Sequence, residues 1–175
     1  MHTDLAREGL NDAAWGKSGV YPLALDWDRP PRGRVFRRSV EVPERRTRLL
    51  IEWEGREPAW VEPTLNSLGE SLALPVNWDS YGARSVDPKS VASAGETLCL
   101  VMESDTIPPT VVPTVHGGVQ FEWHTRGIDL EIEISPLGAP YVSYRNRQDD
   151  TVWEGDLNTN LDRLREVMLR LSHRH

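Results

Sequence analysis

The prediction of the fold depends most on the stretch VQFEWHTRGIDLEIEIS, residues 119–135. Apolar and polar residues alternate on both sides of Arg126 and Gly127, which is typical of two β-strands that each bury one face. A turn on these two residues would join the strands into an antiparallel hairpin. It would match Val119 with Ile134, Phe121 with Ile132 and Trp123 with Leu130. We therefore expect a hairpin with one face on the core and one in water.

The same pairing gathers ionisable side chains on the polar face of the hairpin. It places Glu122 opposite Glu131, and His124 opposite Asp129. Two glutamates directly opposite each other repel, so we expect positive charge nearby.

The next strand can supply that charge. If Ile134 pairs with Val142 across the loop PLGAP, Arg145 faces Glu131 and Arg147 approaches Asp129. The simplest interpretation of the cluster is then an ionic ladder on a solvated sheet face, in which each pair contributes little.

Two other interpretations of the cluster stay open. One is a protein-binding surface. The other is a divalent-metal site in a nuclease or hydrolase, because imidazole and carboxylate groups are suitable ligands. Its residues would be Glu122, His124, Asp129 and Glu131, with Asp79 as a further candidate. Because no metal or nucleotide motif accompanies the cluster, we predict no metal and no cofactor.

The residues around this hairpin extend the antiparallel pattern. Short alternating segments separated by turn residues predict a β-meander of four or five strands over 110–154. Apolar residues at helical spacing then predict a C-terminal helix over 159–173, with Asn158, Thr159 or Asn160 as its N-cap. We expect this helix to cover the sheet.

The N-terminal half predicts a hairpin and two helices. β-like composition interrupted by PERR indicates an Arg-rich hairpin over 34–54. Apolar residues at helical spacing, and Asp87 as an N-cap before Pro88, indicate a helical pair over 60–104. Residues 1–33 lack periodicity and are interrupted by Gly and Pro, which indicates an irregular arm.

Together these elements predict an α+β fold with a single domain over 34–175. The hairpins are grouped and no strand–helix–strand alternation occurs, which favours an antiparallel sheet. We expect a meander of four or five strands plus the N-terminal hairpin, packed against two or three helices.

The N-terminal hairpin is a candidate nucleic-acid interface. Residues 29–48 hold eight Arg and two Glu, although the chain as a whole carries a net charge of −7. The arginines of this candidate binding surface are Arg34, Arg37, Arg38, Arg45, Arg46 and Arg48. They either contact an acidic partner such as RNA or DNA, or pair with the acidic body of the protein.

The string NWDSYGA, residues 77–83, is a candidate recognition loop between the two helices. Trp78 and Tyr81 are large amphipathic anchors, and Asp79 can accept backbone hydrogen bonds in a turn. A purely structural turn and a catalytic Asp79 are the alternatives.

The amino-acid composition limits the kinds of protein that this chain can be. The hydrophobic content of 38% includes no apolar run near the ~20 residues of a membrane span, which argues against a membrane role. The single cysteine, Cys99, excludes an intrachain disulfide. The first residues lack the pattern of a secretory signal, so we expect a cytoplasmic protein.

Three of these strings resemble those of a group of small bacterial proteins. The shared strings are NWD-x-YGA, matched by LPVNWDSYGA at 74–83, and GGV-x-(L/F)-E-W, matched within PPTVVPTVHGGVQFEWH at 108–124, followed by DLEIEI at 129–134. The resemblance covers about residues 65 to 145. It implies a shared structural module of bacterial or phage origin and carries over no catalytic residue.

The function that these observations favour is a non-enzymatic, cytoplasmic protein–protein interaction module. An antitoxin, immunity or phage-defence accessory role would suit its size and acidity. A metal-dependent hydrolase and a nucleic-acid-binding module are the alternatives. The oligomeric state is left open.

Overall fold

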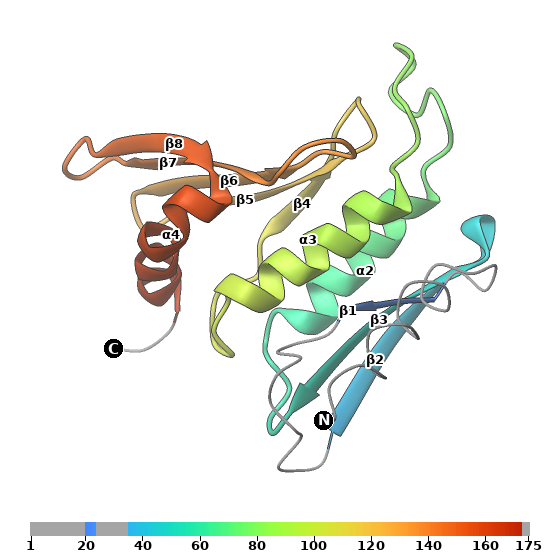
Figure 1. The fold of residues 1–175 in the computed structure, drawn as a ribbon, viewed down its shortest axis with the longest axis horizontal. Helices are drawn as coiled ribbons and strands as arrows, with labels where there is room; N and C mark the ends of the chain where they lie inside the picture. Colours follow the sequence, from blue (N-terminus) through green and yellow to red (C-terminus); the bar gives the residue numbers. More distant parts are fainter. Residues whose placement is uncertain (1–19, 24–34, 173–175) are drawn as a thin grey trace, which may run out of the picture.

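The computed structural model describes residues 20–23 and 35–172, with residues 20–23 and 35 described by their backbone alone (Figure 1). The elements in chain order are β1 (Val20–Leu23), β2 (Val35–Val42), the short 3-10 helix η1 (Pro43–Arg45), β3 (Thr47–Glu54), α2 (Val61–Ala73), α3 (Pro88–Val101), β4 (Thr110–Pro113), β5 (Val119–Thr125), β6 (Ile128–Ile134), β7 (Tyr141–Asn146), β8 (Val152–Asp156) and α4 (Leu157–Leu171). This confirms the predicted α+β fold, with an N-terminal hairpin, a five-strand antiparallel meander and three helices.

Helices α2 and α3 lie in a layer between two separate β-sheets (Figure 1). One sheet has the order β4-β5-β6-β7-β8 and the other the order β1-β3-β2. The packing on α2 is close, because a Cβ added at Gly69 would lie 2.8 Å from Cγ1 of Val40 on β2. With helices filling the space between the sheets, the apolar faces of both sheets point inward and their polar faces point to solvent.

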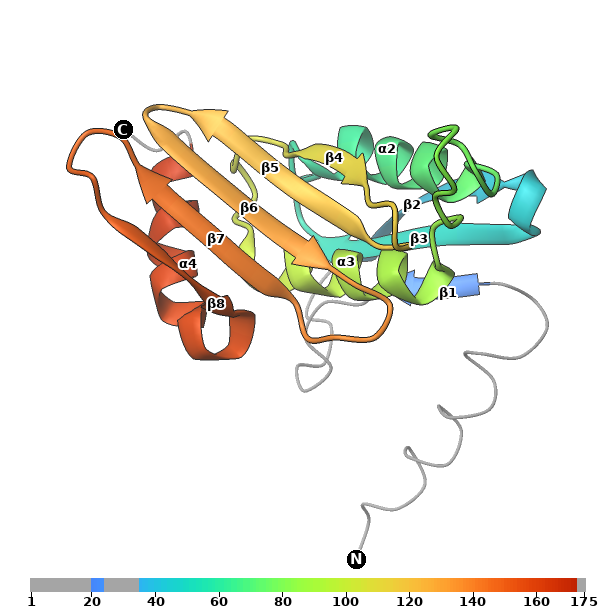
Figure 2. The ribbon, with the colours of Figure 1, turned by 90° about the horizontal axis from the view of Figure 1, so that it is seen from above.

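The five-stranded sheet is the meander that the alternation predicted (Figure 2). Its β5–β6 pairing is the predicted one, with Val119 opposite Ile134 and Glu122 opposite Glu131. The turn residues Arg126 and Gly127 have φ values of 54° and 76°. Positive φ at both positions matches the right-handed twist of the strands, so this turn fixes the register.

The three-stranded sheet contains the predicted N-terminal hairpin. β2 and β3 pair antiparallel around η1, and Arg46 closes the turn with a left-handed φ of 49°. β1 adds a strand parallel to β3. The prediction of an irregular arm over residues 1–33 therefore misses β1, because the open edge of β3 pairs with a segment too short to show periodicity. The rest of that arm lies outside the described residues.

The N-terminal ends of α3 and α4 have side-chain caps. Asp87 caps α3 as predicted, since its carboxylate accepts a hydrogen bond of 2.8 Å from Lys89 N. The predicted cap of the C-terminal helix is wrong. Asp156 is the N-cap of α4, accepting a hydrogen bond of 2.8 Å from Asn158 N. The helix therefore starts two residues earlier than predicted, directly after β8.

The helices found in the described residues are too short or too polar to cross a membrane.

Candidate functional site

The outer face of the five-stranded sheet carries the polar cluster, but the β6–β7 register differs from the prediction. Ile132, and not Ile134, pairs with Val142. The prediction was wrong by two residues, because alternation determines which face a side chain occupies but a shift by two leaves that face unchanged. Residues 135–140 form the connection, and β7 begins only at Tyr141.

This register removes the predicted contact between Glu131 and Arg145. Glu131 lies opposite Ser143, which in turn lies opposite Glu154. The Arg145 guanidinium instead lies 3.5 Å from the Asp150 carboxylate. Glu131 therefore forms no ion pair with an arginine of residues 36–172.

We call Glu131, Glu133 and Glu154 the acidic face. Within residues 36–172, none of the three forms an ion pair, whereas Glu122 lies 3.5 Å from Nε2 of His124. Desolvation, followed by the charge of Glu154, raises the pKa of the neighbouring Tyr141 hydroxyl. Negative charge is therefore concentrated here without an ion pair to any side chain of residues 36–172.

The predicted contact of Asp129 with Arg147 is confirmed. The guanidinium donates two hydrogen bonds of 2.6 Å to the carboxylate, from just beyond the end of β7. The Arg147 guanidinium, helped by His124, lowers the pKa of Asp129 to about 2. The Asp129 carboxylate, 2.9 Å from Nδ1 of His124, in turn raises the pKa of that imidazole.

The contacts of His124 argue against the interpretation of this cluster as a metal site. Both ring nitrogens of His124 face carboxylates, those of Asp129 and Glu122. That arrangement suits a protonated imidazolium, whereas a metal ligand needs a neutral imidazole with a free nitrogen. Over residues 36–172, no three His, Cys, Asp or Glu side chains are arranged to hold a metal ion.

The structure does not bring Asp79 to this cluster. Asp79 lies in the loop between α2 and α3, which contacts the β4–β5 turn at the start of β5, while His124 lies near the end of that strand. Elsewhere in the chain, burial raises the pKa of the Cys99 thiol to about 12, so it is a poor nucleophile.

The loop NWDSYGA is held by its own polar side chains. The Asp79 carboxylate accepts hydrogen bonds of 2.8 and 2.9 Å from the backbone N–H groups of Tyr81 and Ala83. The Asn77 side chain accepts one of 2.7 Å from Gly82 N, and the Trp78 indole donates one of 3.1 Å to a backbone carbonyl. The hydrogen bonds from the Ala83 and Tyr81 N–H groups lower the pKa of Asp79, and they occupy its carboxylate within the turn.

The backbone of this loop is unusual. Asn77, Ser80 and Gly82 have φ values of 64°, 66° and 96°, so two residues other than glycine adopt the left-handed conformation. At the tip, the Tyr81 side chain is 94% exposed. The loop therefore presents a large aromatic residue to solvent from a constrained backbone.

Two other connections meet this loop at one end of the molecule. Arg84 N donates a hydrogen bond of 2.9 Å to Val115 O, and Asp87 N one of 2.8 Å to Gly117 O. At Gly117, an added Cβ would lie 3.0 Å from Ser85 O and 3.7 Å from Pro136 of the β6–β7 connection. A side chain at position 117 would crowd Ser85 O and would be strained by the φ of 88°, whereas the distance to Pro136 is an ordinary van der Waals contact.

We call this region the loop end. Its exposed apolar side chains are Val76, Tyr81, Val115 and Leu137. In Figure 1 the α2–α3 loop projects beyond the level of the five-stranded sheet, on the side of its outer face. The sequence had singled out Trp78, Asp79 and Tyr81, but not Val115 or Leu137, which only the packing of the connections places beside them.

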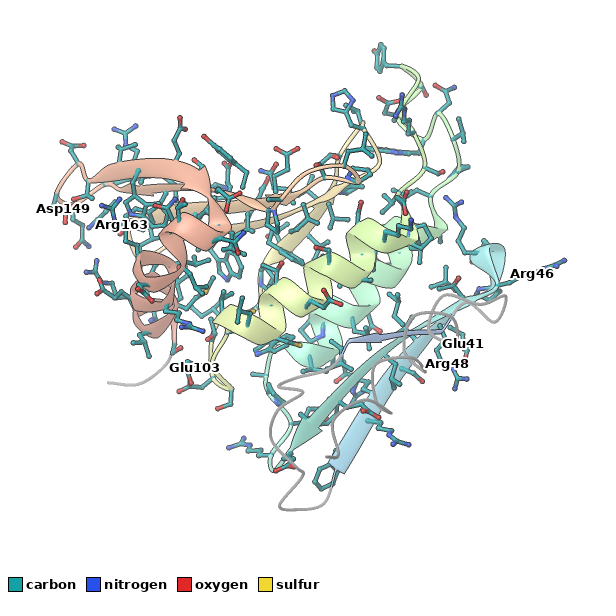
Figure 3. All side chains as sticks on the ribbon, viewed as in Figure 1. Glu41, Arg46, Arg48, Glu103, Asp149 and Arg163 are labelled. Atoms are coloured by element: carbon teal, nitrogen blue, oxygen red, sulfur yellow. The ribbon has the colours of Figure 1, made fainter. Side chains whose placement is uncertain are left out.

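Most of the described arginines of the N-terminal hairpin form ion pairs or hydrogen bonds with other residues of the protein. Arg37 pairs with Glu52 directly opposite it, and Arg48 lies 3.3 Å from Glu41. These residues form cross-strand pairs on the outer face of the three-stranded sheet, and Figure 3 shows Arg48 and Glu41 together there.

Two further arginines tie the hairpin to α2. Arg38 donates to Glu57 in the β3–α2 connection and to Glu62 in the first turn of this helix. Arg45 donates to the carbonyl oxygens of Leu72 and Leu74 at its end. Arg46 is exposed and points away from the body in Figure 3, and Arg34 lies outside the described residues.

Comparisons with protein-family models, curated proteins and solved structures found no match for this chain. The candidate site consists of the loop end and the acidic face. Glu154 was missed from the sequence, although the alternation in TVWEG would have placed it had the β7–β8 pairing been worked out.

Proposed function

We propose that this protein is a non-catalytic protein-binding module whose loop end presents Tyr81 to a partner protein. The single observation that carries the proposal is the near-complete exposure of Tyr81, at 94%, on a loop held by hydrogen bonds that the side chains of Asp79 and Asn77 accept from backbone N–H groups. Tyrosine is a frequent hot-spot residue in protein interfaces. Because the loop is already ordered, binding through it loses little conformational entropy.

The acidic face supports a partner with basic side chains. Glu131, Glu133 and Glu154 lie on the outer side of the sheet, the side toward which the loop projects. A surface rich in Lys or Arg would supply the positive charge that the side chains of residues 36–172 do not provide there. The same carboxylates would repel nucleic-acid phosphates, and most described arginines of residues 36–48 already bind within the protein.

The test is site-specific photocrosslinking with the full chain in its native organism. A photoreactive phenylalanine analogue replaces Tyr81 in one variant and Leu169, which is 52% exposed on α4, in the control. We expect a discrete adduct with one protein at position 81 and not at position 169. Mass spectrometry of the adduct identifies the partner.

A second measurement tests whether binding of the partner depends on the Tyr81 side chain. Tyr81→Ala should lower the affinity of the purified partner by about tenfold or more, which is the loss typical of a hot-spot aromatic residue, and Leu169→Ala should leave it unchanged. Adducts that are equal at both positions, or none at position 81, would contradict the proposal. The identity of the partner also tests the antitoxin, immunity and defence-accessory hypotheses, which remain predictions.

A further inference from the structure

A cavity of about 410 Å³ lies between α4 and the β7–β8 hairpin. It is built on the inner side of the sheet, because Tyr144 and Trp153 point away from the face that carries Arg145 and Glu154. Cavities of roughly 300–1,000 Å³ accommodate small molecules. This site is distinct from the acidic face and from the loop end.

One wall of the cavity is aromatic. The rings of Tyr144 and Trp153 stack with centroids 5.1 Å apart and an interplanar angle of 23°. Tyr144 is buried, whereas Trp153 on the edge strand β8 is only half-buried and lines the cavity together with Val167 of α4. A flat apolar group in the cavity can therefore pack against the indole.

The helix contributes two guanidinium groups. Arg163 and Arg170 are seven residues apart, which places them on the same side of α4, and both line the cavity. Neither forms an ion pair within 4.0 Å with a side chain of residues 36–172, although the charge of Arg170 adds to the hydrogen bonds from Thr151 that lower the pKa of Asp149. Figure 3 shows Arg163 on the side of the molecule where Asp149 marks the tip of the β7–β8 hairpin.

The acidic lining residues limit the charge of a ligand. Asp149 and Glu166 balance the formal charges of the two arginines. Asp149 is engaged locally, since it accepts a hydrogen bond of 2.9 Å from Thr151 N. A single carboxylate therefore suits this lining better than a doubly charged phosphate.

We propose that this cavity binds a small aromatic carboxylate, with its ring against Trp153 and its carboxylate on Arg163 and Arg170. Guanidinium groups bind carboxylates through paired, charge-assisted hydrogen bonds. The site would give the protein a ligand-binding activity in addition to the proposed protein contact, on the other side of the sheet.

Ligand-observed NMR with the full chain tests the site, using benzoate and indole-3-acetate as probes. Benzamide and indole-3-acetamide have the same rings without the charge. We expect saturable binding of at least one carboxylate and about tenfold weaker binding of its amide, which corresponds to the loss of a charge-assisted contact.

Matched variants locate the binding. Arg163→Gln and Arg170→Gln should each weaken carboxylate binding by about tenfold, whereas Arg165→Gln, on α4 but outside the cavity lining, should not. Unchanged circular dichroism confirms that each variant folds. No saturable binding up to about 10 mM, equal binding of acid and amide, or equal loss in the Arg165 control would overturn the proposal.

Discussion

The Arg147 guanidinium donates two hydrogen bonds of 2.6 Å to the Asp129 carboxylate. Arg147 lies just after β7, and Asp129 lies near the start of β6. Arg147 N also donates a hydrogen bond of 2.7 Å to Gly127 O in the β5–β6 turn. The backbone contact aligns the side chain for the ion pair. The pair therefore links three consecutive strands at one end of the sheet.

Arg147→Gln should reduce stability in a pH-dependent way. The pKa of Asp129 is lowered to about 2 in the folded protein, mainly by Arg147, so the stabilisation is present above the unfolded pKa of about 3.9. It is lost as the pH falls through the folded pKa. Melting temperatures should therefore differ between wild type and variant at pH 7, and should converge as the pH falls from about 4 to 2.

Arg145→Gln is the control for that measurement. Its partner Asp150 is 85% exposed, and their charged groups are 3.5 Å apart, so this pair should contribute little. A melting-temperature difference for Arg147→Gln that stays constant down to pH 2 would show that the ion pair is not its cause.

Glu131→Gln should raise the free energy of unfolding. Glu131 lies directly opposite Glu122 and has no ion pair with any side chain of residues 36–172, so the change removes like-charge repulsion of about 0.2–1 kcal/mol. The gain, measured by urea denaturation, should shrink at high salt because the repulsion is screened. Glu44→Gln, on the exposed turn η1, serves as the control. A destabilised Glu131→Gln variant would mean that an attraction, and not repulsion, dominates at this position.

Asp79→Ala should loosen the loop end without unfolding the domain. It removes the acceptor of the Tyr81 and Ala83 N–H groups, so their amide hydrogen exchange should accelerate by about tenfold or more. Exchange in α2 and α3 should be unchanged. Arg84→Ala is the matched control in the same loop, since Trp78 bonds to the backbone carbonyl of Arg84 and not to its side chain. Equal exchange in the Asp79 variant and wild type would mean that the loop is ordered by other contacts.

Arg45→Ala should destabilise the protein by about 1 kcal/mol or somewhat more. The guanidinium satisfies the carbonyl oxygens of Leu72 and Leu74 at the end of α2, where unpaired acceptors are costly. Arg46→Ala, one residue away at an exposed position, should change the unfolding free energy by less than about 0.5 kcal/mol. Similar urea midpoints for the two variants would exclude a capping role for Arg45.

Much of the local structure could be predicted because its causes are local. The alternation around Arg126 and Gly127 gave the correct β5–β6 pairing, since a two-residue turn leaves only one register that buries the apolar side chains. Asp87 before Pro88 gave the correct start of α3, because an N-cap and the proline after it are adjacent in the sequence. The C-terminal helix was predicted to start two residues late, because Asp156, Asn158, Thr159 and Asn160 are all suitable N-cap residues. The sequence alone does not choose between them, whereas in the structure β8 ends at Asp156 and the helix follows directly.

The candidate site was harder to predict. The sequence placed Glu131 on the polar face and opposite Glu122, but it did not give the correct neighbour on β7. A register shift by two keeps the face and moves a side chain by about 7 Å along the strand. That shift separates Glu131 from Arg145. Likewise, the string NWDSYGA indicated a turn with an aromatic anchor, but not its contact with the β4–β5 turn.

The amino-acid sequence by itself determined the strands other than β1, the helices, the polar side of the sheet and the turn around Tyr81. These features depend on periodicity, caps and turn residues within a few positions of one another. Only the tertiary structure decided that α2 and α3 lie between two sheets, that most described arginines of the hairpin bind within the protein, and that the acidic face forms no ion pair with a side chain of residues 36–172. Those outcomes depend on distances between segments far apart in the chain, which packing sets and periodicity does not.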